Sequence, residues 1–189
     1  MKIYTRKGDD GTTGLLYGGR VAKDAAAPTA YGTVDEAQAA IGVARAEVRG
    51  APSDSPGELG DILLGLERDL WVLMAELATD PANVDKLTDG QSRVTASMVT
   101  DLESIIDEVS AGFEPPTEFV VPGETRAAAL LDVARTVVRR AERDAVAAAT
   151  PQSQVLPYLN RLSDLLWTLA RWQEGTSLAA RDVNRPSDR

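Results

Sequence analysis

The chain has 189 residues and a formal net charge of −9, and it contains neither cysteine nor histidine. A chain of this length most simply forms one domain whose core needs no covalent cross-links. The missing residue types exclude disulfides, catalytic thiols, Ser-His-Asp arrangements and metal sites with sulfur or imidazole ligands. Any chemistry must therefore come from carboxylates, cationic side chains, hydroxyls, backbone groups or a bound cofactor.

The charge is unevenly distributed along the chain. Residues 1–24 carry five Lys and Arg against three Asp, a sum of +2, which leaves −11 for the remainder. A cationic arm on an acidic body suits a small anionic ligand better than nucleic acid, whose partners usually present a broad basic face. No apolar run approaches a membrane span or a signal peptide, and the lack of cysteine fits a reducing compartment. We expect a cytoplasmic protein that binds neither nucleic acid nor membrane.

The first predicted element is an N-terminal arm rich in glycine, threonine and cationic side chains. Residues 5–24 read TRKGDDGTTGLLYGGRVAKD. Glycine backbone N–H groups and threonine hydroxyls can donate to phosphate oxygens, while the Lys and Arg side chains supply positive charge. No standard nucleotide fingerprint fits, since residues 14–21 lack the lysine and hydroxyl of a Walker loop. The pattern indicates a phosphate-binding arm, and the structural alternative is a solvated arm that binds nothing.

After the arm, apolar residues spaced by three and four predict a series of amphipathic helices. Prolines forbid a helix over residues 113–122, which we expect to form an extended connector. The predicted helices span residues 31–48, 56–77, 94–112, 124–148 and 155–172.

Five helices with little strand predict an all-α fold, a five-helix antiparallel bundle. We expect a single domain over residues 1–189. Its predicted parts are the arm at 1–27, the helical bundle at 28–174 and a loose tail at 175–189.

The fourth predicted helix carries an unusual polar stripe. Arg135, Arg139 and Glu142 fall within about 60° of one another, beside apolar Leu131 and Val138. An ion-pair ladder within or between subunits would explain this pattern, and so would an arginine clamp on polyphosphate. The pattern alone leaves both readings open.

Two further polar positions border predicted apolar stripes. Asp35 lies at the edge of the stripe on the first helix, where it could pair with such an arginine across an interface. Asn160 and Asp164 share a face of the fifth helix, where a cap or a solvated edge is the ordinary explanation.

Five sequence blocks, taken in order, carry a resemblance to a known family. They read TRKGDDGTT at 5–13, AYGTVDE at 30–36, FVVPG at 119–123, ARTVVRRAER at 134–143 and YLNRLSD at 158–164. From Tyr4 to about Arg171 the chain resembles the propanediol-utilisation type of ATP:cob(I)alamin adenosyltransferases.

The resemblance implies a fold, an assembly and a reaction. The expected fold is a ferritin-like five-helix bundle that forms a homotrimer, with active sites between neighbouring subunits. The expected reaction transfers the 5′-deoxyadenosyl group of ATP to cob(I)alamin and gives adenosylcobalamin and triphosphate. Reduced cobalt is the nucleophile, which agrees with a chain that lacks Cys and His.

The resemblance also implies which residues bind nucleotide, with Mg²⁺ bridging the phosphate oxygens. Those expected in the arm, wrapped around the triphosphate, are Thr5, Arg6, Gly8, Asp10, Gly11, Thr12, Thr13 and Lys23. Those expected from the neighbouring subunit are Arg135, Arg139, Glu142 and Asn160.

The resemblance implies roles for two further residues. Asp35 would pair with Arg135 across the interface. Phe119 would lie under the corrin ring and displace the lower axial ligand, which makes cobalt(II) easier to reduce, because an apolar side chain cannot coordinate the metal. A phenylalanine that simply plugs one end of the bundle core is the structural alternative for Phe119.

The sequence departs from the family pattern at several positions. Asp9 and Asp10 offer two acids where one is usual, and Gln38, Glu124 and Asp132 replace the expected residues, which at Asp132 is commonly histidine. These departures concern contacts near the corrin rather than the reaction class.

Two alternatives of other classes stay open. One is a cobalamin escort that delivers finished cofactor to a mutase without catalysis, and the other is a bundle whose arm and arginines serve only trimer assembly. A di-iron enzyme is excluded because Glu-x-x-His pairs are absent. The enzyme reading implies partners in a flavin reductase and an adenosylcobalamin-dependent mutase.

Overall fold

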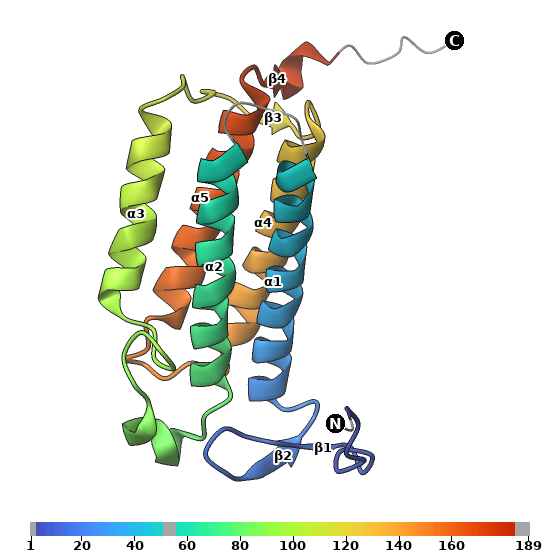
Figure 1. The fold of residues 1–189 in the computed structure, drawn as a ribbon, viewed down its shortest axis with the longest axis vertical. Helices are drawn as coiled ribbons and strands as arrows, with labels where there is room; N and C mark the ends of the chain where they lie inside the picture. Colours follow the sequence, from blue (N-terminus) through green and yellow to red (C-terminus); the bar gives the residue numbers. More distant parts are fainter. Residues whose placement is uncertain (1–2, 51–55, 184–189) are drawn as a thin grey trace.

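The computed structural model describes residues 3–50 and 56–183, and these form an up-and-down bundle of long helices (Figure 1). Helices that follow one another in sequence run in opposite directions. The predicted five-helix bundle is confirmed. Its helices are α1 (Ala26–Gly50), α2 (Pro56–Leu77), α3 (Ala96–Ser110), α4 (Arg126–Ala145) and α5 (Val155–Glu174).

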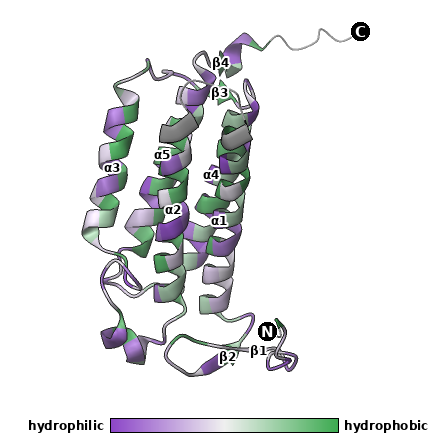
Figure 2. Ribbon diagram, viewed as in Figure 1, coloured by the Kyte–Doolittle hydropathy of each residue, from purple (hydrophilic) through white to green (hydrophobic). Residues whose placement is uncertain are grey.

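The core lies along the helix faces that the sequence pattern predicts. On α1, Val34, Ala37, Ile41 and Ala44 are fully buried. α1 packs against α2 and α4, and α5 packs against α4 and α3. Apolar residues therefore concentrate on the inward faces while charged residues cover the outside (Figure 2). Small residues on α1 and α4 let these two helices approach closely.

Side-chain caps fix where two of the helices begin. The Thr95 hydroxyl accepts the Met98 N–H at 3.3 Å at the start of α3, and the Thr125 hydroxyl accepts the Ala128 N–H at 3.1 Å at the start of α4. Both threonines are in the extended region, as N-cap residues are. α4 therefore begins two residues later than the pattern predicted.

Two short antiparallel strand pairs were not predicted. β1 (Thr12–Gly14) pairs with β2 (Arg20–Ala22) inside the arm, through a turn in which Tyr17 and Gly18 have positive φ. β3 (Val120–Val121) pairs with β4 (Leu178–Ala179), so part of the expected loose tail is hydrogen-bonded to the connector. The sequence could not show this, because the partners are far apart and each strand has two residues. Residues 184–189 of the predicted tail lie outside the described residues.

The two strand pairs lie at opposite ends of the bundle (Figure 1). The arm is attached beside the end of α2, where the Leu16 N–H donates to the Ala78 carbonyl at 2.8 Å. A 3₁₀ turn, η1 (Pro81–Lys86), follows α2 at that end, and a second, η2 (Ala180–Asp182), follows β4 at the other. α4 has 20 residues and so spans about 30 Å between the ends. Within the described residues, no helix is long and apolar enough to cross a membrane.

Candidate functional site

The arm is shaped by Asp10. Its Oδ1 accepts the Thr12 N–H at 2.9 Å and the Thr12 hydroxyl at 2.8 Å. These bonds lower the pKa of Asp10, with a smaller contribution from the nearby Arg20 guanidinium. Arg20 in turn donates to the Thr12 hydroxyl and to the Lys7 carbonyl. Asp10 therefore holds the loop in shape, whereas the side chain of Asp9 makes no hydrogen bond to any described residue.

Backbone geometry brings several predicted phosphate contacts together. Arg6 and Gly11 have φ values of 61° and 79°, in the left-handed region that glycine adopts most easily. The Lys23 side chain crosses the loop at Gly8, where an added Cβ would lie 3.2 Å from Nζ. The Lys23 N–H also donates to the Gly11 carbonyl at 2.9 Å. The ammonium of Lys23 therefore lies over the glycine-rich turn.

Thr13 and Thr5 are the two remaining predicted site residues of the arm. Thr13 lies in β1 opposite Val21 and is partly buried. Thr5 is exposed, and its hydroxyl accepts the Lys7 N–H at 3.4 Å.

The polar stripe on α4 is divided between bound and free side chains. Glu142 accepts a hydrogen bond from Asn160 Nδ2 at 3.1 Å, so α4 and α5 hold these two predicted site residues together. Arg161 donates to Asn160 Oδ1 at 2.8 Å and to Glu103 at 2.7 Å. Arg139 is exposed, and within the described ranges its guanidinium makes no hydrogen bond or ion pair. Arg139 is thus available for an external anion.

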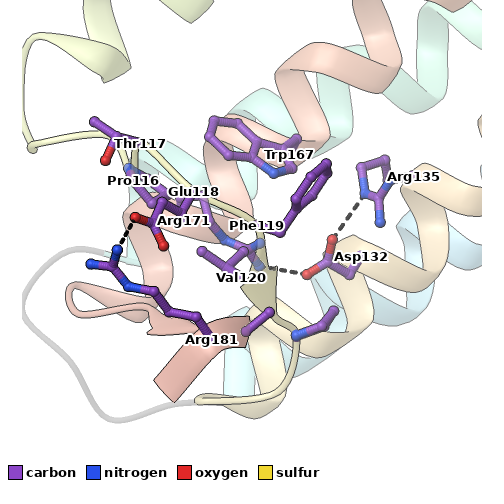
Figure 3. Close-up of a pocket in the computed structure, with 12 residues that line it drawn as sticks. Pro116, Thr117, Glu118, Phe119, Val120, Asp132, Arg135, Trp167, Arg171 and Arg181 are labelled. Atoms are coloured by element: carbon purple, nitrogen blue, oxygen red, sulfur yellow. Dashed lines mark hydrogen bonds and ion pairs between the residues drawn. The ribbon is translucent and has the colours of Figure 1, made fainter. Parts of the chain in front are cut away.

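A cleft of about 740 Å³ opens at the other end of the bundle (Figure 3). Phe119 lies in its wall and is 91% exposed, which excludes the alternative of a core plug. Trp167 of α5 lies beside it, so two aromatic side chains face the same space. The apolar residues of the wall include Pro116, Val120 and Pro122. The cleft is suited to a large, largely apolar ligand.

One wall of the cleft is charged. Asp132 is buried between α4 and α5, and it accepts from Arg135 Nε at 2.9 Å and from Arg171 Nη2 at 2.5 Å. On the opposite side Arg181 pairs with Glu118 at 2.5 Å. Arg135 therefore has an ion-pair partner within its own helix, as one of the two readings of the α4 stripe allowed, although the sequence did not identify Asp132 as that partner.

Asp35 lies away from this cleft. It is exposed on α1 in a shallow depression of about 380 Å³ with Gln38, Trp71 and Leu64. Within the described ranges it forms no ion pair, and Arg135 contacts Asp132 instead. Trp71 is 67% exposed, which is unusual for so large an apolar side chain. A contact between Asp35 and Arg135 would therefore require a second copy of the chain.

Three residues of the cleft were missed or undervalued from the sequence. Asp132 was noted only as a departure, and Trp167 and Arg171 were not singled out. The available signal was the i, i+4 spacing of Trp167 and Arg171 on α5, where an arginine follows the apolar stripe of a buried helix. The side-chain wall depends on contacts between α4 and α5, which periodicity does not specify.

The acidic residues do not form a metal cage. Among the described residues there is no group of three or more Asp, Glu, His or Cys side chains that could hold a metal ion. A divalent cation that comes with a nucleotide is usually held by phosphate oxygens, water and one or two carboxylates. Asp9, exposed and without a hydrogen-bond partner among those residues, fits that lesser role.

Comparison with known proteins identifies relatives over nearly the whole chain. The chain is 47% identical over 175 residues to a corrinoid adenosyltransferase of Mycobacterium tuberculosis, covering 90% of this chain and 87% of the relative. It is 42% identical over 178 residues to a corrinoid adenosyltransferase of Citrobacter freundii, covering 93% and 96%.

Solved structures agree with the sequence comparison. A variant of a PduO-type ATP:corrinoid adenosyltransferase from Lactobacillus reuteri, complexed with cobalamin and ATP, superposes with a TM-score of 0.83 at 28% identity and covers 96% of this chain and 97% of its own. The sequence profile of the family described as cobalamin adenosyltransferase matches residues 3–173. The resemblance seen in the five blocks is confirmed: the chain belongs to the cobalamin adenosyltransferase family of transferases.

Proposed function

We propose that this protein transfers the 5′-deoxyadenosyl group of ATP to the cobalt of cob(I)alamin. The observation that carries this proposal is its 42% identity to a corrinoid adenosyltransferase over 93% of the chain. The cob(I)alamin lone pair attacks C5′ of ATP, the cobalt–carbon bond forms, and the C5′–O bond breaks. Triphosphate leaves with the electron pair of that bond, and adenosylcobalamin is the other product.

The chain's own work in this reaction is positioning and electrostatic stabilisation. The Lys23 ammonium lies over the glycine-rich turn, and it would bind the triphosphate together with Arg6 and the backbone N–H groups of the turn while the negative charge of the leaving triphosphate grows. Arg139, with no intrachain partner in the described ranges, supplies a further cation. Mg²⁺ would be held mainly by the phosphate oxygens, with the exposed Asp9 as a candidate carboxylate.

The corrin would occupy the cleft that Phe119 and Trp167 line. Phe119 offers no atom that can coordinate cobalt, and its exposure lets it stand against a ring bound in the cleft. An apolar side chain at the lower face would keep cobalt(II) four-coordinate and thus easier to reduce to the nucleophilic cobalt(I) state.

A homotrimer would bring the two ends together. Within one chain, the arm and the cleft lie at opposite ends of the bundle, so the ATP bound by one copy would meet the corrin bound beside a neighbour (Figure 1). Exposed apolar residues support such an interface, because Leu64 and Trp71 line the depression that holds Asp35, and Val43 on α1 and Val133 on α4 are also exposed. Asp35 and the free edge of Arg135 have opposite charges and would pair across it.

The assay that tests this proposal is anaerobic and uses chemically reduced cobalamin with Mg-ATP. We expect ATP-dependent adenosylcobalamin, seen in the cobalt absorption bands, and one triphosphate per product. A cobalamin escort would bind the corrin but release no triphosphate. Well-folded protein that shows no turnover in this assay would contradict the proposed enzyme activity. We propose that the protein acts in the cytoplasm. A reductase supplies its electrons, and a mutase accepts its product.

A further inference from the structure

A network of four charged side chains lies at one wall of the cleft, and three of them, Asp132, Arg135 and Arg171, line it. Asp132 binds Arg135 Nε through Oδ1 and Arg171 Nη2 through Oδ2. The same Arg171 nitrogen donates to Glu174 Oε1 at 3.0 Å. Two carboxylates balance two guanidiniums, and the network leads from the bundle interior to Arg135 at the edge of the cleft (Figure 3).

Stability alone does not account for this network. Arg171 is 2% exposed, and its Nε has no hydrogen-bond partner in the part of the chain that the structure describes. Taking ions out of water costs free energy that their attraction often fails to recover, so a well-packed apolar pair would hold α4 and α5 at least as well. A buried arginine with an unpaired donor calls for a role besides packing.

The role follows from what the network holds. The Arg135 side chain is one-quarter exposed, and its two terminal nitrogens donate no hydrogen bond to any described residue. With Nε bound to Asp132, those nitrogens remain free to bind a carboxylate. The Arg171 guanidinium carbon lies 5.8 Å from the centroid of the Trp167 ring, within cation–π range. Asp132 thus orients Arg135 by a direct hydrogen bond. It also holds Arg171, which in turn contacts the Trp167 ring.

A carboxylate suits this role at position 132 because its two oxygens accept from two different arginines and its charge is opposite to theirs. Each carboxylate oxygen accepts one guanidinium, whereas a neutral imidazole has a single acceptor nitrogen. A histidine, which the family resemblance leads one to expect here, would accept from one of the two arginines, and if that were Arg135 the buried Arg171 would have Glu174 as its remaining partner. Asp132 and Arg171 therefore belong together as a pair.

We propose that Asp132 is a positioning residue for cobalamin use, which holds Arg135 in its working orientation while Arg171 fixes Asp132. The proposal rests on the proposed function. Without the carboxylate, Arg135 regains the rotamer freedom of an exposed side chain, and the corrin site forms less often. The arm and Arg139 are not in contact with the network, so ATP binding suffers less than cobalamin binding.

A double-mutant cycle on the full chain tests this. Kinetics with reduced cobalamin and Mg-ATP compare wild type, Asp132→Asn, Arg135→Gln and the double variant. We expect Asp132→Asn to raise the KM for cobalamin about tenfold, as loss of one charged hydrogen bond does. In the Arg135→Gln background the same change should alter KM by less than about twofold. Equal effects in both backgrounds would overturn the proposal.

Asp69→Asn is a matched control. Asp69 is a partly buried carboxylate that accepts a hydrogen bond from Tyr158 at 2.9 Å, outside the cleft. It should change the melting temperature while leaving the KM for cobalamin as in wild type. If Asp69→Asn raised the KM for cobalamin as much as Asp132→Asn does, the effect of Asp132 would be explained by lost protein stability and the proposal would be wrong.

A second variant tests the proposal if Asp132→Asn protein does not fold. Asp132→Leu combined with Arg171→Met removes the buried Asp132–Arg171 ion pair and every acceptor at position 132, so Arg135 is left unheld and the same rise in KM is expected. A normal KM in folded protein of this variant contradicts the proposal. Titration with cob(II)alamin, followed by tryptophan fluorescence, measures the same weakening without turnover. Wild-type protein that binds corrin in this way but never turns over contradicts the proposed function and leaves the positioning test intact.

Discussion

The two ends of the bundle are built in different ways. The arm is shaped by bonds between residues close in sequence, such as Asp10 with Thr12 and Lys23 with Gly11. The cleft is assembled from three distant segments, since Phe119 follows α3, Asp132 lies on α4 and Trp167 on α5. The arm is exposed and cationic, while the cleft has a buried charge network. Local sequence can specify a phosphate loop, whereas a large apolar site needs the whole fold.

The largest expected effect comes from removing Arg139, an exposed cation of α4 that forms no ion pair with any described residue. Arg139→Ala should lower kcat/KM for ATP about 100-fold, because a charged hydrogen bond to phosphate is lost in a site where charge develops. Its neighbour Arg140 pairs with Glu36, so Arg140→Ala is the matched control and should cost less than about threefold. Steady-state kinetics with ATP as the varied substrate provides the comparison. Similar losses for both variants would mean that α4 contributes only general positive charge.

The chain has two phenylalanines, and substituting each one separates the effect of a side chain in the cleft from that of a side chain in the core. Phe119→Ala should leave the melting temperature unchanged, because the side chain is 91% exposed, and should slow turnover from cobalt(II) about tenfold or more. Activity from chemically pre-reduced cobalt(I) should fall less. Phe113 packs against the bundle core, so Phe113→Ala should instead cost about 2 kcal/mol of stability and spare the reaction.

Electron paramagnetic resonance of bound cobalt(II) separates the two variants directly. Wild type and Phe113→Ala should show the four-coordinate species with ATP bound, and Phe119→Ala should not. A normal four-coordinate yield in Phe119→Ala protein would contradict the assignment of this side chain to the lower face of the corrin.

The same contrast explains what the sequence could predict. The stripe of Val34, Ala37 and Ile41 follows helix periodicity, so the bundle and its buried faces were predictable. Phe119 was identified only through its block of neighbouring residues, because periodicity cannot tell an exposed aromatic from a core plug. Arg171 was missed for a related reason: its partner Asp132 lies 39 positions away on another helix. The strand pair β3–β4 was not predicted, because a strand of two residues is too short to show alternating hydrophobicity.

A change of assembly is expected where the ends would meet. Trp71→Asp should convert the proposed trimer to monomer, because it places a charge beside Asp35 in an exposed apolar patch. Analytical ultracentrifugation gives the mass of each species. The monomer should stay folded, since Trp71 is mostly exposed, but should lose turnover if the site requires two copies. Trp172 packs against the core, so Trp172→Phe is a control that should keep the trimer. A fully active Trp71→Asp monomer would contradict the shared site.

The smallest expected effect concerns a carboxylate that belongs to neither end. Asp69 on α2 is partly buried, and this burial raises the pKa of Asp69 above its ordinary value. The hydrogen bond from Tyr158 of α5 and the charge of Arg68 oppose the rise, and Asp101 adds to it. The folded state therefore favours the protonated carboxyl. Its contribution to stability is fully present below about pH 4, the ordinary Asp range, and is lost as pH rises through the folded-state pKa.

Asp69→Asn removes that titration and keeps an oxygen that can accept from Tyr158. The stability of wild type relative to this variant should accordingly fall as pH rises from about 4, and urea unfolding at a series of pH values measures the difference. Turnover at neutral pH should be the same for both proteins, because Asp69 lies in neither the arm nor the cleft. A difference in stability that stays flat with pH would show that Asp69 is ionised equally in the folded and unfolded chains. A large loss of turnover would show instead that the middle of the bundle couples to its ends.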